Sequence, residues 1–166
     1  MPLLRNGRVS DEDRWHRLGD DEPLPDAVPG TEAGVALSLP RFLAHAAGEE
    51  AGSADSGQVA GVWLAPADDA LALAPWLGRL QLVAIDFPAY TDGRGYSQAR
   101  QLRRRLGFDG EIRAFGDVRP DQVLFMMRSG IDAFEFDTAP DAASLRQALS
   151  RYRTSYQPSY PLPIAG

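Results

Sequence analysis

One stretch of the sequence decides the fold: residues 82–106, Leu82-Val-Ala-Ile-Asp-Phe-Pro-Ala-Tyr-Thr-Asp-Gly-Arg-Gly-Tyr-Ser-Gln-Ala-Arg-Gln-Leu-Arg-Arg-Arg-Leu106. Its first part, Leu82–Phe87, is a short apolar run typical of a buried strand. A glycine-rich turn follows, and then a helix is predicted over Tyr96–Leu106, with its apolar residues on one face. A strand, a turn and a helix in this order form the unit from which parallel α/β sheets are built.

The same order of strand and helix is predicted four times in succession. The other strands are predicted at Val59–Leu64, Glu111–Phe115 and Ile131–Phe136, and the other helices over Asp68–Leu80, from Pro120 to Gly130 and from Pro140 to Tyr152. We therefore expect an α/β fold with a parallel sheet and right-handed crossovers. The sheet is either open and doubly wound or half of a (βα)8 barrel. A half barrel would leave an apolar edge, which favours a homodimer.

Composition divides the chain into three parts. Residues 1–57 carry the whole net charge of −6 and are predicted to form an acidic N-terminal arm. The elements expected in this arm are a β-hairpin around Asn6-Gly7, a strand at Val35–Leu39 and a short helix over Arg41–Ala47. Residues 58–153 form the predicted α/β core. Residues 154–166, rich in Pro and Tyr, are predicted to be a flexible tail.

Several classes of function are excluded by what the sequence lacks. The chain has no cysteine and only two histidines, His16 and His45, far apart, so we expect no metal ion and no cofactor. An acidic chain without a dominant basic face argues against nucleic-acid binding. No apolar run is long enough to span a membrane and no secretory signal is visible, so the expected location is the cytoplasm.

Acidic residues follow the predicted strands, where ligands gather in parallel α/β folds. They are Asp86, Asp117 and Glu135 or Asp137, and the turn Asp92–Ser97 is expected over the same edge of the sheet. A carboxylate beside an arginine there can bind a substrate or position a proton donor. The catalytic candidates are Asp86, Asp92 and Arg94. Asp117 and Asp137 precede predicted helices, and capping is the favoured interpretation for both.

The turn also predicts an anion site, because backbone N–H groups at a helix start attract negative charge. Its residues are Gly93, Arg94, Gly95, Tyr96, Ser97 and Arg100. The turn contains Gly-x-Gly but lacks the third glycine of a dinucleotide-binding loop and the lysine of a P-loop. For Arg94 a functional and a structural role are equally supported. For the helix arginines Arg103–Arg105, a solvated helix face is the favoured interpretation.

Two longer runs of sequence carry a resemblance to a known family. They are Phe87-Pro-x-Tyr-Thr-Asp-Gly-Arg-Gly-Tyr-Ser-x-Ala-Arg-x-Leu-Arg and Leu106-Gly-Phe-x-Gly-Glu-Ile-Arg-Ala-Phe-Gly-Asp-Val. The chain resembles a bacterial family labelled as an oxidoreductase involved in sulfite reduction and encoded beside assimilatory sulfite or nitrite reductase. The resemblance covers residues 82–137, and the region of Trp15 loosely. Phe115 departs from the family pattern, where a small aliphatic residue is expected.

The resemblance implies an accessory protein of assimilatory sulfate and sulfite reduction. Such a protein would bind an oxyanion, or sulfite reductase or another sulfate-assimilation enzyme, through the turn Asp92–Ser97. Two alternatives stay open. The chain could be a small α/β enzyme that grips an anionic substrate with Asp86, Asp92 and Arg94, or a structural assembly factor.

Overall fold

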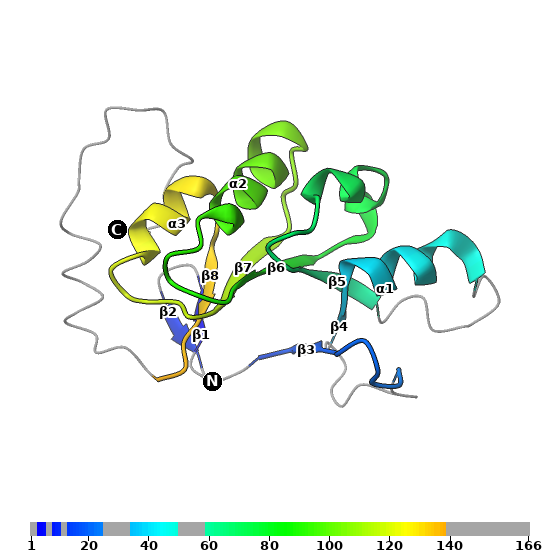
Figure 1. Ribbon diagram of the computed structural model, residues 1–166, viewed down its shortest axis with the longest axis horizontal. Coiled ribbons are helices and arrows are strands. Elements are labelled where there is room, and N and C mark those ends of the chain that lie inside the picture. The colour runs from blue at the N-terminus through cyan, green and yellow to red at the C-terminus, as the bar shows by residue number, and fades with distance from the viewer. Residues whose placement is uncertain (1–2, 6–7, 11–12, 25–33, 50–58, 139–166) are drawn as a thin grey trace.

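A curled, mostly parallel sheet organises the chain (Figure 1). The computed structural model describes residues 3–5, 8–10, 13–24, 34–49 and 59–138. The strands are β1 (Leu3–Arg5), β2 (Arg8–Ser10), β3 (Trp15–Arg17), β4 (Gly34–Ser38), β5 (Val59–Leu64), β6 (Leu82–Phe87), β7 (Glu111–Gly116) and β8 (Ala133–Glu135), in the spatial order β2-β1-β8-β7-β6-β5-β4-β3. Strands β3 to β8 are parallel, whereas β1 pairs antiparallel with both β8 and β2.

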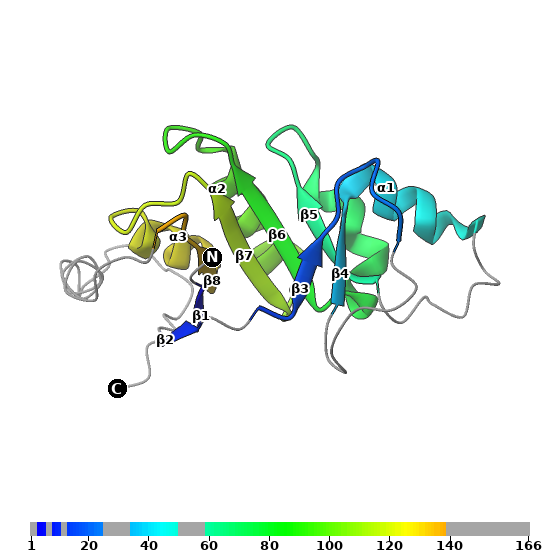
Figure 2. The ribbon, with the colours of Figure 1, turned by 90° about the horizontal axis from the view of Figure 1, so that it is seen from below.

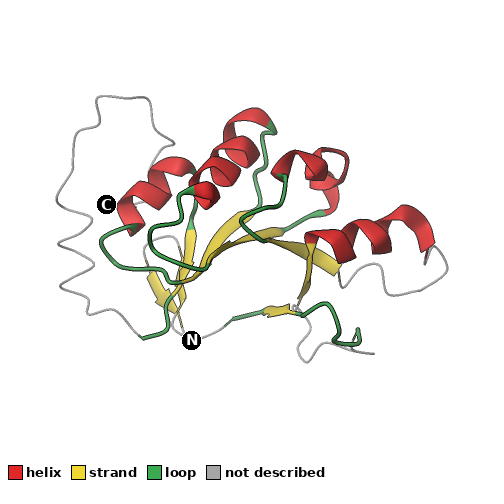
Figure 3. Ribbon diagram, viewed as in Figure 1, coloured by secondary structure: helices red, strands yellow, loops and turns green. Residues whose placement is uncertain are grey.

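The helices lie together on one face of this sheet, as Figure 3 shows. They are α1 (Leu39–Ala44) with its π-helical continuation η1 (His45–Glu49), the 3₁₀ helix η2 (Ala70–Arg79), α2 (Arg94–Arg100) with its π-helical continuation η3 (Gln101–Arg105), and α3 (Val123–Ser129). From β3 to β8 the spatial order of the strands follows the chain, so right-handed crossovers place every helix on the same side. A doubly wound sheet would need a reversal of strand order. The fold is therefore α/β with a half-barrel sheet.

The predicted strands 59–64, 82–87 and 111–115 are confirmed, but the number of strand–helix units differs from the prediction. Strand β4 and helix α1 confirm the strand and the short helix predicted in the N-terminal arm, but they form an additional strand–helix unit of the same sheet. The predicted fourth helix from Pro140 lies outside the described residues. The tail 154–166 lies outside them too. Strand β3, Trp15–Arg17, was not predicted, because three residues in an acidic stretch show no period of their own.

The N-terminal hairpin is confirmed, with Leu4 opposite Val9. Strand β1 also pairs with β8, and β4 pairs with β5, so strands from residues 1–57 belong to the same sheet as the core strands. The predicted boundary near residue 58 lies outside the described residues.

The two faces of the sheet differ because side chains alternate along each strand. On β6, Val83, Ile85 and Phe87 join the apolar core under the helices, while Leu82, Ala84 and Asp86 occupy the opposite positions. We call this second, concave face the inner face; Figure 2 views the sheet from that side, with the helices behind it. Burial of the helix-facing side chains, each about 1.5–3 kcal/mol, holds the helices on the sheet.

Helix α3 begins later than predicted. Pro120 lies in a turn, and the helix starts at Val123 with Gln122 as the N-cap residue. Asp117 therefore does not cap α3, and the capping interpretation is wrong for this residue. The predicted end of the helix at Gly130 is confirmed, since this glycine has a φ of 108° and its N–H closes the last turn.

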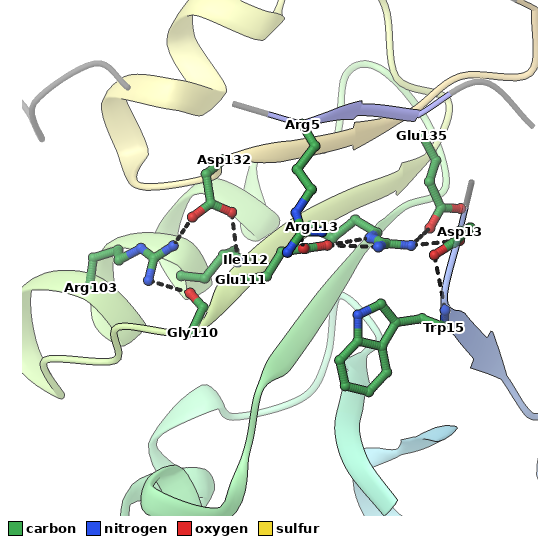
Figure 4. Close-up of polar contacts among 10 residues, drawn as sticks. All are labelled: Arg5, Asp13, Trp15, Arg103, Gly110, Glu111, Ile112, Arg113, Asp132 and Glu135. Carbon is green, nitrogen blue, oxygen red and sulfur yellow. Dashed lines mark hydrogen bonds and ion pairs between the residues drawn. The ribbon is translucent and has the colours of Figure 1, made fainter. Parts of the chain in front are cut away.

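Arg103 is buried, so the interpretation of a fully solvated arginine face is wrong for this residue. Its Nε donates to the Gly130 carbonyl at 2.8 Å, and its Nη1 donates to the carbonyls of Phe108 and Gly110. Its Nη2 pairs with Asp132, whose other oxygen accepts from the Ile112 N–H (Figure 4). Arg103 thus joins the end of the α2–η3 helix to the two loops that lead into β7 and β8.

We predict that Arg103→Met destabilises the protein by about 3–5 kcal/mol, because it leaves Asp132 and three carbonyls without their cation. Urea unfolding followed by tryptophan fluorescence measures the loss. The matched control is Arg105→Met on the same helix, where the side chain is exposed and the expected change stays within about 0.5 kcal/mol. Equal stability of the two variants would contradict a structural role for Arg103.

Candidate functional site

The carboxyl ends of the parallel strands meet at one edge of the sheet, which we call the rim. Asp86 stands next to the end of β6, Asp117 directly follows β7, and Glu135 ends β8, as the sequence predicted. Their environments differ, however. Glu135 is buried and ion-paired, Asp117 lies in a loop, and Asp86 is half-buried on the inner face. The three carboxylates therefore do not form a matched acid–base set.

The turn before α2 is organised by one ion pair, Asp92–Arg94. Asp92 Oδ1 accepts from the Arg94 backbone N–H at 3.1 Å, and Oδ2 accepts from Arg94 Nη2 at 2.6 Å. These bonds hold the pKa of Asp92 at about 2 and raise the pKa of Arg94. The two charges neutralise each other in an exposed position. An anion bound by Arg94 would have to compete with Asp92, and anion binding here stays a prediction.

The glycines of the turn have different roles. A Cβ on Gly95 would lie 2.5 Å from Cζ of Phe87 and 2.9 Å from a methyl group of Ile85, so only glycine lets α2 approach β6 this closely. The next residue, Tyr96, packs edge-on against Phe87 with 5.5 Å between the ring centroids. A Cβ on Gly93 would meet nothing within 4 Å. Much of the Gly-x-Gly-Tyr pattern is therefore explained by helix-to-sheet packing.

The remaining predicted anion-site residues, Ser97 and Arg100, are exposed on the first turns of α2. Gln98, between them, is buried instead, and its side-chain amide donates to the carbonyls of Ala65 and Asp68 at 2.9 Å each. The contacts of Gln98 tie α2 to the loop after β5. Ser97 and Arg100 remain accessible to a binding partner.

A second group of polar contacts stands beside the turn, and we call it the rim cluster: Tyr90, Asp117, Arg119 and Gln122. The Asp117 carboxylate accepts from the Tyr90 N–H at 3.0 Å and from Arg119 Nε at 3.1 Å. Gln122 donates to the Tyr90 carbonyl at 2.7 Å, and the Arg119 guanidinium lies 3.9 Å from the centre of the Tyr90 ring. Both Arg119 and the Tyr90 N–H lower the pKa of Asp117. The cluster fixes an exposed tyrosine on the rim.

The inner face holds an ion-pair network centred on Arg113, drawn in Figure 4. Arg113 is 1% exposed; its Nη2 lies 2.7 Å from Glu111, and its Nη1 lies 2.7 Å from Asp13 and 3.0 Å from Glu135. Two more arginines bind the same carboxylates. Arg5 lies 2.8 Å from Glu111, and Arg17 pairs with Glu135. Three positive and three negative charges thus balance inside the half barrel.

The network was not predicted, although the sequence carries a signal for it. Glu111 and Arg113 occupy alternate positions of a predicted strand, so both must face the same side of the sheet. Buried charges need partners, and these partners come from β1, β8 and the segment before β3, far apart in sequence. The alternation indicates that one side of this strand is charged, but it does not indicate which residues form ion pairs with Glu111 and Arg113.

Asp86 points to the inner face, close to this network but outside it. Burial raises the pKa of Asp86, and the charge of Asp92 raises it further, whereas the positive charge of Arg17 lowers it. The inner-face position separates Asp86 from Asp92 and Arg94, which bind each other on the exposed side of the rim. The three catalytic candidates therefore lie near one another, but they do not present one common set of side chains.

Residues 3–5, 8–10, 13–24, 34–49 and 59–138 contain no group of three histidine or acidic side chains placed to hold a metal ion. In the same ranges no helix is both long and apolar enough to cross a bilayer.

We predict that Gly95→Ala destabilises the protein by about 1–3 kcal/mol, because the added methyl group overlaps Phe87 and Ile85. The control is Gly93→Ala in the same turn, which has open space around it and costs at most about 1 kcal/mol through its N-cap position. Thermal and urea unfolding of both variants give the comparison. A larger loss for the Gly93 variant would contradict the packing role of Gly95.

We predict that Arg94→Ala raises the pKa of Asp92 from about 2 toward its ordinary value, because the guanidinium hydrogen bonds are lost. In the native protein this pKa lies below that of the unfolded chain, about 3.9. The stabilisation from the pair is therefore present above about pH 4 and is lost as the pH falls toward 2. An NMR titration of the Asp92 carboxyl carbon tests this, and an unchanged pKa in the variant would refute it.

Comparison with known proteins identifies the family of this chain but no activity. A family model described as a bacterial protein of unknown function (DUF934) matches residues 61–164, which include the rim, the turn and α2. No curated protein and no solved structure matches the chain. The description of the family names no activity, so a role in sulfite reduction remains a prediction. The match covers more than half of the chain, which therefore belongs to the DUF934 family of bacterial proteins.

Proposed function

We propose that the protein is an accessory protein of assimilatory sulfate and sulfite reduction that docks on the reductase, or on another enzyme of this pathway, through its rim loops. These loops are residues 90–94 and 117–122. The observation that carries the docking part is an exposed tyrosine held in place by its neighbours. The link to sulfite reduction is supported by the resemblance of residues 82–137 to the family labelled with that role.

Tyr90 has the features of an interface anchor. Its side chain is 49% exposed, yet its backbone is held on both sides by Asp117 and Gln122, and Arg119 stacks on its ring. Tyrosine and arginine are enriched among the residues that dominate binding energy at interfaces. A side chain that is already ordered loses little conformational entropy on binding, so more of its contact energy appears as affinity.

The charges of the rim loops favour a protein over a free anion. Asp92–Arg94 and Asp117–Arg119 are exposed pairs of opposite charge, with one residue between the partners in each case. Such a surface has no excess positive charge to attract an oxyanion, but it offers donors and acceptors around a central aromatic residue. Oxyanion binding at Gly93–Ser97 and Arg100 is the alternative at the same place. It requires Arg94 to leave Asp92.

An enzyme that uses Asp86, Asp92 and Arg94 together is less well supported. Asp92 and Arg94 satisfy each other's charges on the exposed side, whereas Asp86 faces the inner side of the sheet. An assembly factor would use the same docking surface without changing the reaction. Comparing the sulfite reductase activity with and without the protein separates an accessory role from assembly alone.

We predict that Tyr90→Ala weakens binding to sulfite reductase from the same organism by about tenfold or more, as expected for the loss of an anchor residue. Titration of the reductase with the full chain in a calorimeter or on a biosensor surface measures the dissociation constant. Arg105→Ala, an exposed charge on η3 outside the rim loops, is the control and leaves binding unchanged.

Two outcomes would overturn this docking function. One is no binding to the reductase or to another enzyme of the pathway, and the other is full-strength binding by the Tyr90 variant. Sulfite or sulfate that raises the thermal midpoint of the wild type, but not that of Arg94→Ala, would favour the oxyanion alternative instead.

A further inference from the structure

We propose a second site, on the inner face at the carboxyl end of the sheet, that binds a small flat molecule carrying a positively charged amine or amidine. Asp86 binds the cation, and Trp63, Phe115 and Arg17 form the surroundings of the flat part. This inference is independent of docking through the rim loops, because it uses side chains on the other face of β6.

Strand register places these side chains together. Asp86 on β6 stands beside Phe115 on β7, and Trp63 on β5 stands beside Ala84, the preceding inner-face residue of β6. Because alanine is small, Trp63 and Phe115 meet across it with their ring centroids 6.4 Å apart and their planes at 86°. The carboxylate of Asp86 thus follows directly after a pair of aromatic rings.

The inner face is closed at one end and accessible at the other. Toward the amino ends of the strands, Leu82 and Ala84 are fully buried and Arg113 is 1% exposed. Toward the rim, Trp63, Asp86 and Phe115 are all half-buried. Solvent therefore reaches this end of the inner face, as it does at the ligand-binding end of complete (βα)8 barrels.

Arg17 and Gly116 fix the shape of the site. The Arg17 guanidinium lies 4.0 Å from the centre of the Phe115 ring and is held there by its ion pair with Glu135. Gly116 has a φ of 94°, and a Cβ at this position would lie 2.4 Å from the Phe87 carbonyl oxygen and 3.0 Å from Asp86 Oδ1. The glycine thus leaves room for the carboxylate next to the backbone of β7.

The balance of charge selects the ligand. Arg17 and the other arginines of the network are matched one for one by Glu111, Glu135 and Asp13. Within the described residues, Asp86 has no hydrogen-bond donor and no cation at ion-pair distance. It is therefore the excess charge of the inner face. A cation neutralises it, whereas an anion would face a second negative charge, and the partly desolvated carboxylate strengthens the attraction.

The aromatic surroundings select the same class of ligand. Cations are attracted to the faces of Trp and Phe rings, and a flat group packs against such rings with little loss of freedom. A flat amine satisfies both requirements at once: its charge lies at Asp86 and its apolar part against Trp63 and Phe115. Benzylamine has this chemistry, and benzoate is a probe of similar size with the opposite charge.

The test is binding of benzylamine and benzoate to the full chain, followed by NMR shifts of the Trp63 indole N–H. Benzylamine is expected to bind and to shift this signal, and benzoate is not. Asp86→Asn is expected to weaken benzylamine binding by about tenfold or more, because a charge-assisted hydrogen bond becomes a neutral one. Asp117→Asn removes a rim carboxylate that is bound by Tyr90 and Arg119 and lies outside this site, and it is expected to leave the affinity unchanged.

Folding of the key variant is checked independently. Within the described residues, Asp86→Asn breaks no hydrogen bond or ion pair, so the variant should keep or raise the thermal midpoint. Absence of benzylamine binding, binding that is unaffected by Asp86→Asn, or preferential binding of benzoate would each overturn the proposal. A failure to bind the reductase would not contradict the proposed amine site, because the reductase experiment tests only the rim loops.

Discussion

The burial of Arg113 is the constraint on which the rest of the structure depends. Its guanidinium stands in the middle of the inner face, and a buried cation without partners would cost several kcal/mol. Glu111 on the same strand supplies one carboxylate, and Glu135 on β8 supplies another. Asp13 supplies the third from the segment that leads into β3. The N-terminal part of the chain is thereby joined to the inner face of the core sheet.

Two further arginines extend this connection to β3 at one edge of the sheet and to β1 near the other edge. Arg5 on β1 reaches Glu111, and Arg17 on β3 reaches Glu135, which lies on the far side of the curled sheet. Five strands lie between β1 and β3 in the order of the sheet, yet Arg5 and Arg17 each bind a carboxylate that also pairs with Arg113. The ion pairs therefore hold the curvature of the half barrel in addition to satisfying the buried charges.

The inner face is buried toward the amino ends of the strands, and both proposed binding surfaces lie at the rim. At the rim, one surface faces outward and carries Tyr90 with its polar neighbours, while the other faces inward and carries Asp86 with the aromatic pair. Both surfaces are built from the ends of β6 and β7 and the loops that follow them. The charge of Asp92 in the rim loops contributes to the raised pKa of Asp86.

The sequence by itself determined the local units. Alternating and continuous apolar runs located β5, β6 and β7, Asn6-Gly7 indicated the hairpin, and Gly130 marked the end of α3. These signals are local, since each depends on side-chain periodicity or on the backbone freedom of one glycine. The candidate residues Asp86, Asp92 and Arg94 were located in the same way, from their place after a strand.

Only the tertiary structure decided which charges are buried and what they bind. Arg103 and Arg113 lie in patterns that fit a solvated helix and an ordinary strand, and each finds its partners on other elements. Strand β3 exists because β4 pairs with it and Arg17 crosses the inner face, not because three residues favour a strand. The division of Asp86 from the Asp92–Arg94 pair likewise depends on the tertiary structure, because Asp86 lies on the inner face of β6 whereas Asp92 and Arg94 pair with each other in the turn that follows. Ion pairs and strand register join residues that are far apart in the chain. A local sequence pattern therefore cannot predict these partners.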